Sequence, residues 1–259
     1  MKLRWKNLEV DVLGLFPEAL KNEEFLVYYQ PKVSLRNYRL AGAEALVRWK
    51  HGDSFIFPDQ FIPTLEKDGA ICELDFYMLD HVCANMRHWL DQGRRLFKVS
   101  VNLSRAHLRD EKLVERIIQT IDNHNVPHEY IEIELTETTT DVGFAELRKV
   151  IDGLHAQMIS TSVDDFGMGY SSMNLIRELP WDVLKIDKCF LPKNENDHRQ
   201  YVMLKHIISL AQDIGLDTIV EGVETIEHVK MLKENNCFLA QGYFFDKPLP
   251  IEEFEKRLD

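Results

Sequence analysis

Five acidic side chains stand beside apolar runs that are spread over most of this 259-residue chain: Glu44, Glu134, Asp164, Asp165 and Glu221. Carboxylates repel one another, so a site that gathered them would stay assembled only around a cation. Hard divalent cations prefer oxygen ligands of this kind. If the fold brings these residues together, the sequence therefore predicts a divalent metal site.

Two further residues complete this hypothesis. Asn102 offers a neutral carbonyl oxygen and Lys185 a positive charge, and both lie in or at the end of an apolar run. The adjacent Asp164 and Asp165 could serve two ions through one bridging carboxylate, an arrangement typical of enzymes that hydrolyse phosphate esters. Two divalent ions and Lys185 would balance five carboxylates. Any single polar strand end also has an ordinary explanation, because it can cap a helix or meet water.

The overall charge and the cysteines argue against several other classes of protein. The chain has 31 basic and 43 acidic residues, a net charge of −12. A nucleic acid polymer is therefore not an expected partner, since the phosphate backbone requires clustered Lys and Arg. The four cysteines form no CxxC pair, so we expect reduced thiols in a cytoplasmic protein. No apolar run reaches the ~18 residues that cross a bilayer, and we expect no membrane contact from this domain.

Apolar runs rich in β-forming residues alternate with stretches of helical period, such as residues 113–121 and 201–214. This alternation predicts a mainly parallel sheet with crossover helices, and eight runs point to a closed (β/α)8 TIM-type barrel. Its chemistry would lie at the carboxyl ends of the strands, where we place Gln30 and Pro31 at the end of the first. The expected strands are Phe25–Tyr29, Leu40–Val47, Phe97–Leu103, Ile131–Leu135, Ile159–Val163, Val183–Ile186, Thr218–Val220 and Leu239–Phe244.

Residues 1–24 differ from the rest of the chain. An amphipathic helix is compatible with the apolar positions Leu8, Val12, Leu13, Phe16 and Leu20. Two interpretations stay open: a lid over the lower end of the barrel, or the remains of a linker from an upstream domain. We expect residues 1–24 to be this helix or linker remnant and residues 25–259 to form the barrel domain.

A set of short motifs runs in a fixed order from about residue 20 to residue 250. The tripeptide Glu44-Ala45-Leu46 would carry little weight alone. The others are Tyr29-Gln30-Pro31, Asn102-Leu103-Ser104, Glu134-Leu135-Thr136-Glu137, Asp164-Asp165-Phe166-Gly167, Lys185-Ile186-Asp187, Glu221-Gly222-Val223-Glu224 and Gln241-Gly242-Tyr243. Together they resemble the EAL-domain cyclic-di-GMP phosphodiesterases, a family named after the tripeptide.

The resemblance implies a barrel with one antiparallel strand and hydrolysis of cyclic di-GMP to linear pGpG by a metal-activated water. Mg²⁺ or Mn²⁺ would be the two activating ions, and Ca²⁺ is expected to be inhibitory. Lys185 is similar to the lysine that orients the water, and Glu44 and Glu221 join it in the catalytic set. By the same resemblance the metal ligands would be Glu44, Asn102, Glu134, Asp164, Asp165 and Glu221.

Further roles follow from the same resemblance. Glu137 matches the glutamate that anchors the loop of residues 165–172, which couples metal binding to dimerisation. Met168 stands in this loop where the family usually has Thr or Ala. Two interpretations stay open: Met168 weakens the hydrogen bonding of the loop and thereby the coupling, or it packs elsewhere and leaves the coupling unchanged. The substrate-binding residues would be Gln30, Leu46, Arg48, Asp187 and Gln241.

Two other functions compete with this prediction. The chain could be a receptor that binds cyclic di-GMP without hydrolysing it, although such domains usually lack a metal ligand and none is missing here. An unrelated metal-dependent barrel hydrolase is the third hypothesis, and the order of the motifs argues against it. The resemblance also leaves room for a homodimer and for an upstream sensory or GGDEF domain outside this chain.

Overall fold

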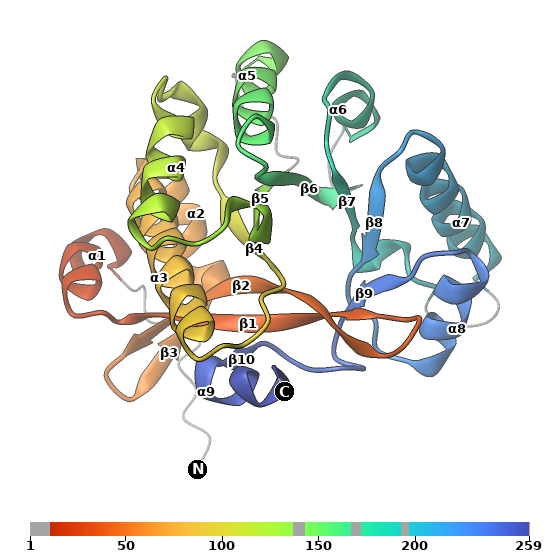
Figure 1. The fold of residues 1–259 in the computed structure, drawn as a ribbon, viewed down its shortest axis with the longest axis horizontal. Coiled ribbons are helices and arrows are strands. Elements are labelled where there is room, and N and C mark those ends of the chain that lie inside the picture. Colours follow the sequence, from red (N-terminus) through yellow and green to blue (C-terminus); the bar gives the residue numbers. More distant parts are fainter. Residues whose placement is uncertain (1–10, 137–142, 167–171, 193–196, 259) are drawn as a thin grey trace.

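The computed structural model describes residues 11–136, 143–166, 172–192 and 197–258. Ten strands within these ranges form one mixed sheet that closes on itself (Figure 1). They are β1 (Phe25–Ser34), β2 (Arg39–His51), β3 (Ser54–Ile56), β4 (Lys98–Leu103), β5 (Ile131–Thr136), β6 (Ser160–Phe166), β7 (Val183–Ile186), β8 (Asp217–Val220), β9 (Leu239–Gln241) and β10 (Leu249–Pro250).

The barrel consists of β1, β2 and β4 to β9, with β3 and β10 added at its edges. From β2 through β9 these barrel strands pair in parallel, whereas β1 is antiparallel to both of its barrel neighbours. Gln30 of β1 faces Glu44 of β2, and Lys32 faces Gln241 of β9. The expected eight-stranded TIM-type barrel with one antiparallel strand is therefore confirmed.

The first strand differs from its predicted extent. We expected it to end at Tyr29, with Gln30 and Pro31 at a carboxyl end of the barrel, but β1 continues to Ser34. Proline ordinarily ends a strand because it cannot donate a ladder hydrogen bond. Here Pro31 is accommodated within β1 opposite Ala43 of β2. Because β1 extends from Phe25 to Ser34, Gln30 lies in the middle of the strand and not at its end.

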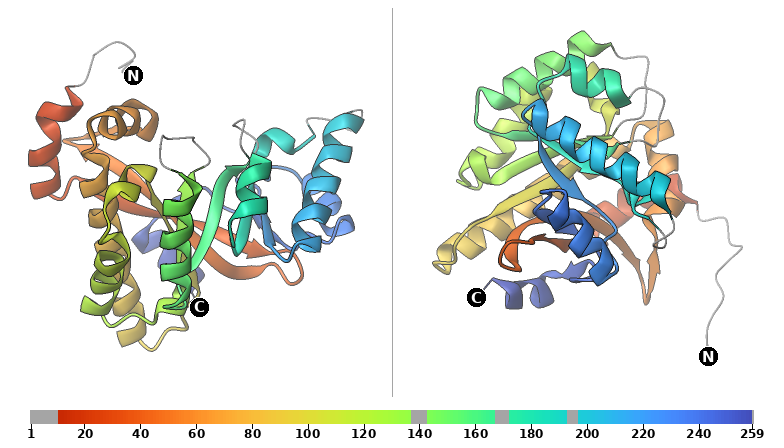
Figure 2. Two further views of the ribbon diagram at one scale, coloured as in Figure 1. Left: turned by 90° about the horizontal axis from the view of Figure 1, so that it is seen from above. Right: turned by 90° about the vertical axis from the view of Figure 1, so that its right-hand side faces the viewer.

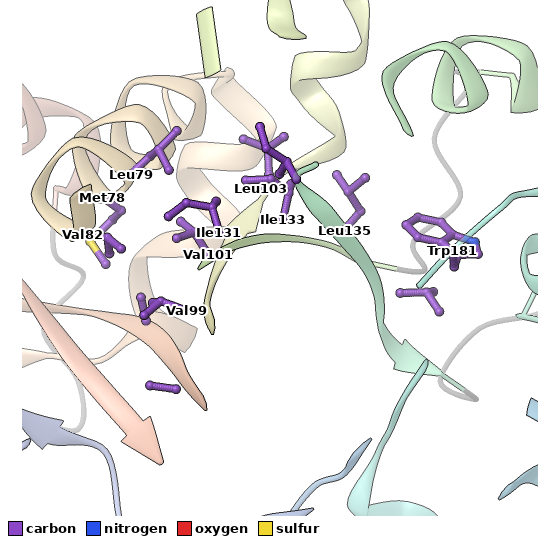
Figure 3. Packing of buried hydrophobic residues seen from close by; sticks show 14 of the residues in the cluster. Met78, Leu79, Val82, Val99, Val101, Leu103, Ile131, Ile133, Leu135 and Trp181 are labelled. Atoms are coloured by element: carbon purple, nitrogen blue, oxygen red, sulfur yellow. The ribbon is translucent and has the colours of Figure 1, made fainter. Parts of the chain in front are cut away.

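Side chains alternate across the barrel wall, because successive residues of a strand point to opposite faces. The apolar residues of β4 and β5 face outward, and β4 packs against α3 (Ile71–Asp91). In Figure 3 the outward side chains extend from Met78, Leu79 and Val82 of α3 to Leu135, which lies toward Trp181. These outward residues are Val99, Val101, Leu103, Ile131, Ile133 and Leu135. The residues between them carry polar side chains, and the interior of the barrel is therefore available for chemistry.

Helices cover the outside of the barrel (Figure 2). The expected helical stretches are confirmed as α4 and α7, whose apolar stripes are buried. Besides α3, the helices are α1 (Val12–Lys21), α2 (Pro58–Asp68), α4 (Leu113–Asn123), α5 (Phe144–His155), α6 (Ser172–Glu178), α7 (His198–Asp213), α8 (Ile226–Glu234), α9 (Ile251–Phe254) and the 3₁₀ turns η1 (Arg105–Arg109), η2 (His128–Tyr130), η3 (Lys188–Phe190) and η4 (Glu255–Arg257).

In the described ranges no helix combines the length and the apolar character that crossing a membrane requires.

The helix expected near the N-terminus is α1. Asp11 caps it by accepting a hydrogen bond from Gly14 N–H, and Phe16 turns its ring toward Phe25 at a centroid distance of 5.7 Å. Phe25 pairs with Trp49, near the carboxyl end of β2. α1 thus lies toward that end, opposite to the lid over the lower end that one interpretation of residues 1–24 predicts.

Candidate metal centre

Four of the predicted carboxylates surround one buried lysine. Lys185 lies on β7 with 1% of its surface exposed. Its Nζ is 2.6 Å from Glu134 Oε2, 2.8 Å from both Asp164 Oδ1 and Glu221 Oε1, and 3.6 Å from Glu44 Oε1. The carboxylates come from β2, β5, β6 and the segment after β8, and the parallel register of the barrel brings them to one level.

Two amide side chains fix the carboxylate of Glu44. Asn102 Nδ2 donates to its Oε1 at 3.2 Å, and Gln241 Nε2 donates to its Oε2. Gln241 also donates to Gln30 Oε1 at 3.1 Å, so β1, β2 and β9 are joined beneath the cluster. Asn102 uses its amide donor in this contact, and its carbonyl oxygen is the atom that could bind a cation.

The segment that carries Glu221 docks closely against β9. Val223 N–H donates to the carbonyl of Gln241 at 3.0 Å. A Cβ on Gly242 would lie 2.2 Å from the backbone of Val223, so only glycine permits this approach. At this point the chain turns to contact the loop after β8. The strand β9 therefore ends at Gln241, whereas we predicted it to continue to Phe244.

Burial and like charges disfavour the ionised form of two carboxyl groups in the cluster. Burial raises the pKa of Glu44, and Lys185 opposes this while Glu134 and Asp164 reinforce it. Burial also raises the pKa of Glu221 to about 8, again against the attraction of Lys185. For Glu134 the two lysines outweigh burial and lower the pKa to about 2. A divalent cation would relieve the repulsion that remains.

The donor set fits such a cation. One oxygen each from Glu44, Glu134 and Asp164 lie within 4.8 Å of one another, and all three side chains are buried. Asp164 Oδ1 and Glu221 Oε1 are buried and pair with Lys185 at 2.8 Å, but among the described residues neither accepts a well-aligned hydrogen bond. Buried carboxylate oxygens are normally hydrogen-bonded or bound to a cation. These residues could therefore hold a hard divalent cation, which prefers oxygen ligands.

A cavity of about 270 Å³ adjoins the cluster and would give a ligand access to it. Glu44, Asn102 and Asp164 form its polar wall, and Leu46 and Arg48 lie beside them. Leu46 and Arg48 are half-buried, as expected for residues at the wall of a binding site. Their predicted contact with a substrate stays a prediction, but their position agrees with it.

The other predicted site residues have different surroundings. Asp187 caps η3 by accepting a hydrogen bond from Cys189 N–H at 2.8 Å. Glu137, Met168 and the side chain of Asp165 lie outside the described residues. The role of Asp187 in substrate binding, the loop anchoring by Glu137 and the ligand role of Asp165 therefore stay predictions.

Sequence reasoning missed three polar residues inside the barrel: Lys32, Ser100 and Glu132. All three are buried, and Lys32 Nζ donates to Ser100 Oγ at 2.7 Å and to Glu132 Oε1 at 3.0 Å. The spacing of these residues along their strands could have identified them. Each residue stands two positions before or after a predicted site residue on the same strand, so it shares the inward face.

Comparison with known proteins connects this geometry to a family. The family model described as "EAL domain" matches residues 15–248, which includes every strand of the barrel. The chain belongs to the EAL domain family. Its Glu44, the first residue of the name-giving motif, is thus the buried carboxylate held by Asn102 and Gln241.

Two curated proteins illustrate the relation to other EAL domains. The chain is 33% identical over 242 residues to the cyclic di-GMP phosphodiesterase NbdA of Pseudomonas aeruginosa, and the match covers 93% of this chain and 31% of NbdA. It is 33% identical over 240 residues to the signaling protein YkoW of Bacillus subtilis, covering 92% of this chain and 30% of YkoW. The chain therefore spans about a third of the length of these relatives.

A solved structure gives the same result in three dimensions. The PaMucR phosphodiesterase in complex with c-di-GMP superposes with a TM-score of 0.87 at 32% sequence identity. The match covers 95% of this chain and all of that one. The EAL fold of this chain is therefore closely similar to that of a domain seen with c-di-GMP bound.

Proposed function

We propose that this chain is a metal-dependent phosphodiesterase that hydrolyses cyclic di-GMP to linear pGpG. The observation that carries the proposal is the buried cluster of Glu44, Glu134, Asp164 and Glu221 around Lys185. The names of the relatives support the substrate, since NbdA is a cyclic di-GMP phosphodiesterase and PaMucR was solved with c-di-GMP.

Glu44, Glu134 and Asp164, with Asn102 and Glu221 beside them, would hold the metal. Mg²⁺ or Mn²⁺ bound there would supply positive charge to the phosphoryl oxygens and lower the pKa of a water near them. Asp165 would contribute to a second ion, as the resemblance implies.

The chain's own residues prepare the site in two ways. Lys185 holds the carboxylates at one level, and its ammonium group is within hydrogen-bond distance of three of them, where it could also orient the attacking water. Arg48 places a guanidinium group at the cavity, donating to Val47 O at 2.8 Å and lying 5.6 Å above the Tyr28 ring. A fixed positive group at this point suits an anionic phosphodiester.

Incubation of the purified chain with cyclic di-GMP and Mg²⁺ tests the proposal, with pGpG as the expected product. Glu44→Ala removes a carboxylate of the cluster and should reduce hydrolysis by at least ~100-fold, while the outward-packed core of the barrel stays intact. Glu111→Ala, at an exposed position before α4, is the matched control and should leave the rate unchanged.

Two outcomes would contradict the proposal. Tight binding of cyclic di-GMP by wild-type protein without hydrolysis would favour the receptor function. Normal turnover by a folded Glu44→Ala protein would show that the cluster is not the metal site.

A further inference from the structure

A second lysine lies inside the barrel, below the cluster. Lys32 of β1 is 5% exposed and points to the same side of its strand as Gln30. Its Nζ donates to Ser100 Oγ at 2.7 Å, Glu132 Oε1 at 3.0 Å and Glu134 Oε1 at 3.0 Å. Lys32 thus connects the antiparallel strand β1 to β4 and β5, and one of its partners on β5 is the candidate metal ligand Glu134.

The carboxylate of Glu134 is held at both oxygens. Lys32 contacts Oε1, and Lys185 contacts Oε2 at 2.6 Å. Lys185 also lies 2.8 Å from Asp164 Oδ1, so Oε2 is the Glu134 oxygen on the side of the cluster. The Glu134 side chain is fully buried, and a carboxylate fixed in this way has one orientation toward a cation.

We propose that Lys32 is a positioning residue of the metal centre: it holds Oε1 of Glu134 toward the barrel floor, so that Oε2 is presented to the cation. This inference rests on the proposed function. Glu132 neutralises Lys32, so the platform formed by Lys32, Ser100 and Glu132 orients Glu134 while adding little net charge to the site.

A purely structural role must be separated from positioning. Removing Lys32 alone would leave Glu132 as an unpaired buried charge, which is strongly destabilising. The double variant Lys32→Met/Glu132→Gln removes one charge of each sign and preserves side-chain length at both positions. Glu134 Oε1 then loses its ion pair with Lys32 while the platform keeps its charge balance.

The experiment compares wild type, Glu132→Gln, the double variant and a matched lysine control. The control is Lys98→Met, because Lys98 of β4 also hydrogen-bonds a serine within the barrel, Ser160 Oγ of β6, at 2.6 Å. Three quantities are measured for each protein: the metal-free melting temperature, the affinity for Mn²⁺ by calorimetric titration, and kcat and KM with cyclic di-GMP.

In the double variant, Mn²⁺ affinity should fall ~10-fold or more. Its metal-free melting temperature should stay close to that of Glu132→Gln, and its KM should change less than twofold. Excess Mg²⁺ should restore part of kcat, because the ligands remain and only their orientation is lost. Glu132→Gln and Lys98→Met should keep the wild-type Mn²⁺ affinity within about twofold, because Glu134 keeps its contact with Lys32.

Wild-type Mn²⁺ affinity in the folded double variant would overturn the proposal, as would a loss of affinity that only parallels a loss of melting temperature. If the double variant does not fold, Ser100→Ala, which removes one acceptor of Lys32, should lower Mn²⁺ affinity about threefold, and an unchanged affinity would overturn the proposal. If the wild type failed to hydrolyse cyclic di-GMP, only the proposed function would be contradicted, and the Mn²⁺ titration would still decide on Lys32.

Discussion

At the scale of single residues, the charge balance of the site depends on Lys185. It is the shared partner of Glu134, Asp164 and Glu221, each within 2.8 Å of its Nζ. The same contacts suit two roles: neutralising the carboxylates and orienting a water for attack on the phosphodiester. The two roles differ in what is lost when the charge is removed.

Lys185→Met keeps length and apolar bulk but removes the charge and the donors. If Lys185 orients the water, hydrolysis in Mg²⁺ should fall ~100-fold, about 2.7 kcal/mol on the barrier, while cyclic di-GMP binding in Ca²⁺ is unchanged. Turnover assays and calorimetric titration on the same protein measure both. Parallel losses of binding and turnover would show that Lys185 only screens the carboxylates.

The residues of the cluster could be predicted from the sequence, because a bound cation is the simplest reason for several carboxylates to gather at the strand ends of one barrel. Glu44, Glu134, Asp164 and Glu221 do converge, and their predicted roles as ligands await the experiments above. The role of Lys32 could not be predicted in this way. A single lysine in an expected strand gives no sign of its partners, which lie 68 to 102 positions further along the chain.

At the scale of elements, one contact anchors the end of β4 that presents Asn102. Asp75 of α3 accepts hydrogen bonds from Ser104 N–H at 2.8 Å and from His107 Nε2 of η1 at 3.1 Å. Burial lowers the pKa of His107, but the hydrogen bonds and charges of Asp75 and Cys72 outweigh burial and raise it to about 9. The imidazolium–carboxylate pair therefore joins α3, β4 and η1.

This pair predicts a pH dependence of stability. The folded pKa of His107 is above the value of about 6.5 for an unfolded histidine, so its contribution is fully present below pH 6.5 and lost as pH rises through 9. The free energy of unfolding should fall by up to about 3 kcal/mol across this window relative to His107→Gln, which keeps a donor toward Asp75 but does not titrate. Urea denaturation at pH 6 and pH 9.5 measures the difference.

The matched control for this prediction is His124→Gln. His124 also pairs with an aspartate, Asp80 at 2.7 Å, but the pair lies at the surface. The control should follow the wild-type pH dependence closely. An identical pH dependence in wild type and His107→Gln would contradict the role of the buried pair.

The strands of the barrel could be predicted more fully than their connections. Seven parallel strands are recognisable because buried apolar runs alternate with helices of clear period. The family resemblance implied one antiparallel strand but did not say which, and the structure identifies it as β1. Sequence alone could not show this, because the hydrophobic pattern of a strand is the same in either direction. The short strands β3 and β10 were missed, because three residues or two carry too little periodicity to be seen.

At the scale of the whole molecule, metal binding and folding should be linked. The folded barrel gathers carboxylates from β2, β5, β6 and the segment after β8, which an unfolded chain keeps far apart. A cation that binds only the folded state stabilises it by mass action. Because the chain carries a net charge of −12, relief of repulsion at this cluster also reduces the self-repulsion of the folded protein.

The choice of cation separates stabilisation from catalysis. Mg²⁺, Mn²⁺ and Ca²⁺ should each raise the melting temperature of wild-type protein, with a gain of about 2.7 kcal/mol at a free concentration 100 times Kd, and EDTA should reverse it. Only Mg²⁺ and Mn²⁺ should support hydrolysis, because Ca²⁺ prefers longer bonds and a looser geometry that would misplace the ligands around the phosphodiester. Glu44→Ala should lose both responses. Equal rates in Ca²⁺ and Mg²⁺ would contradict the proposed geometry, and a melting temperature that no cation changes would contradict the site itself.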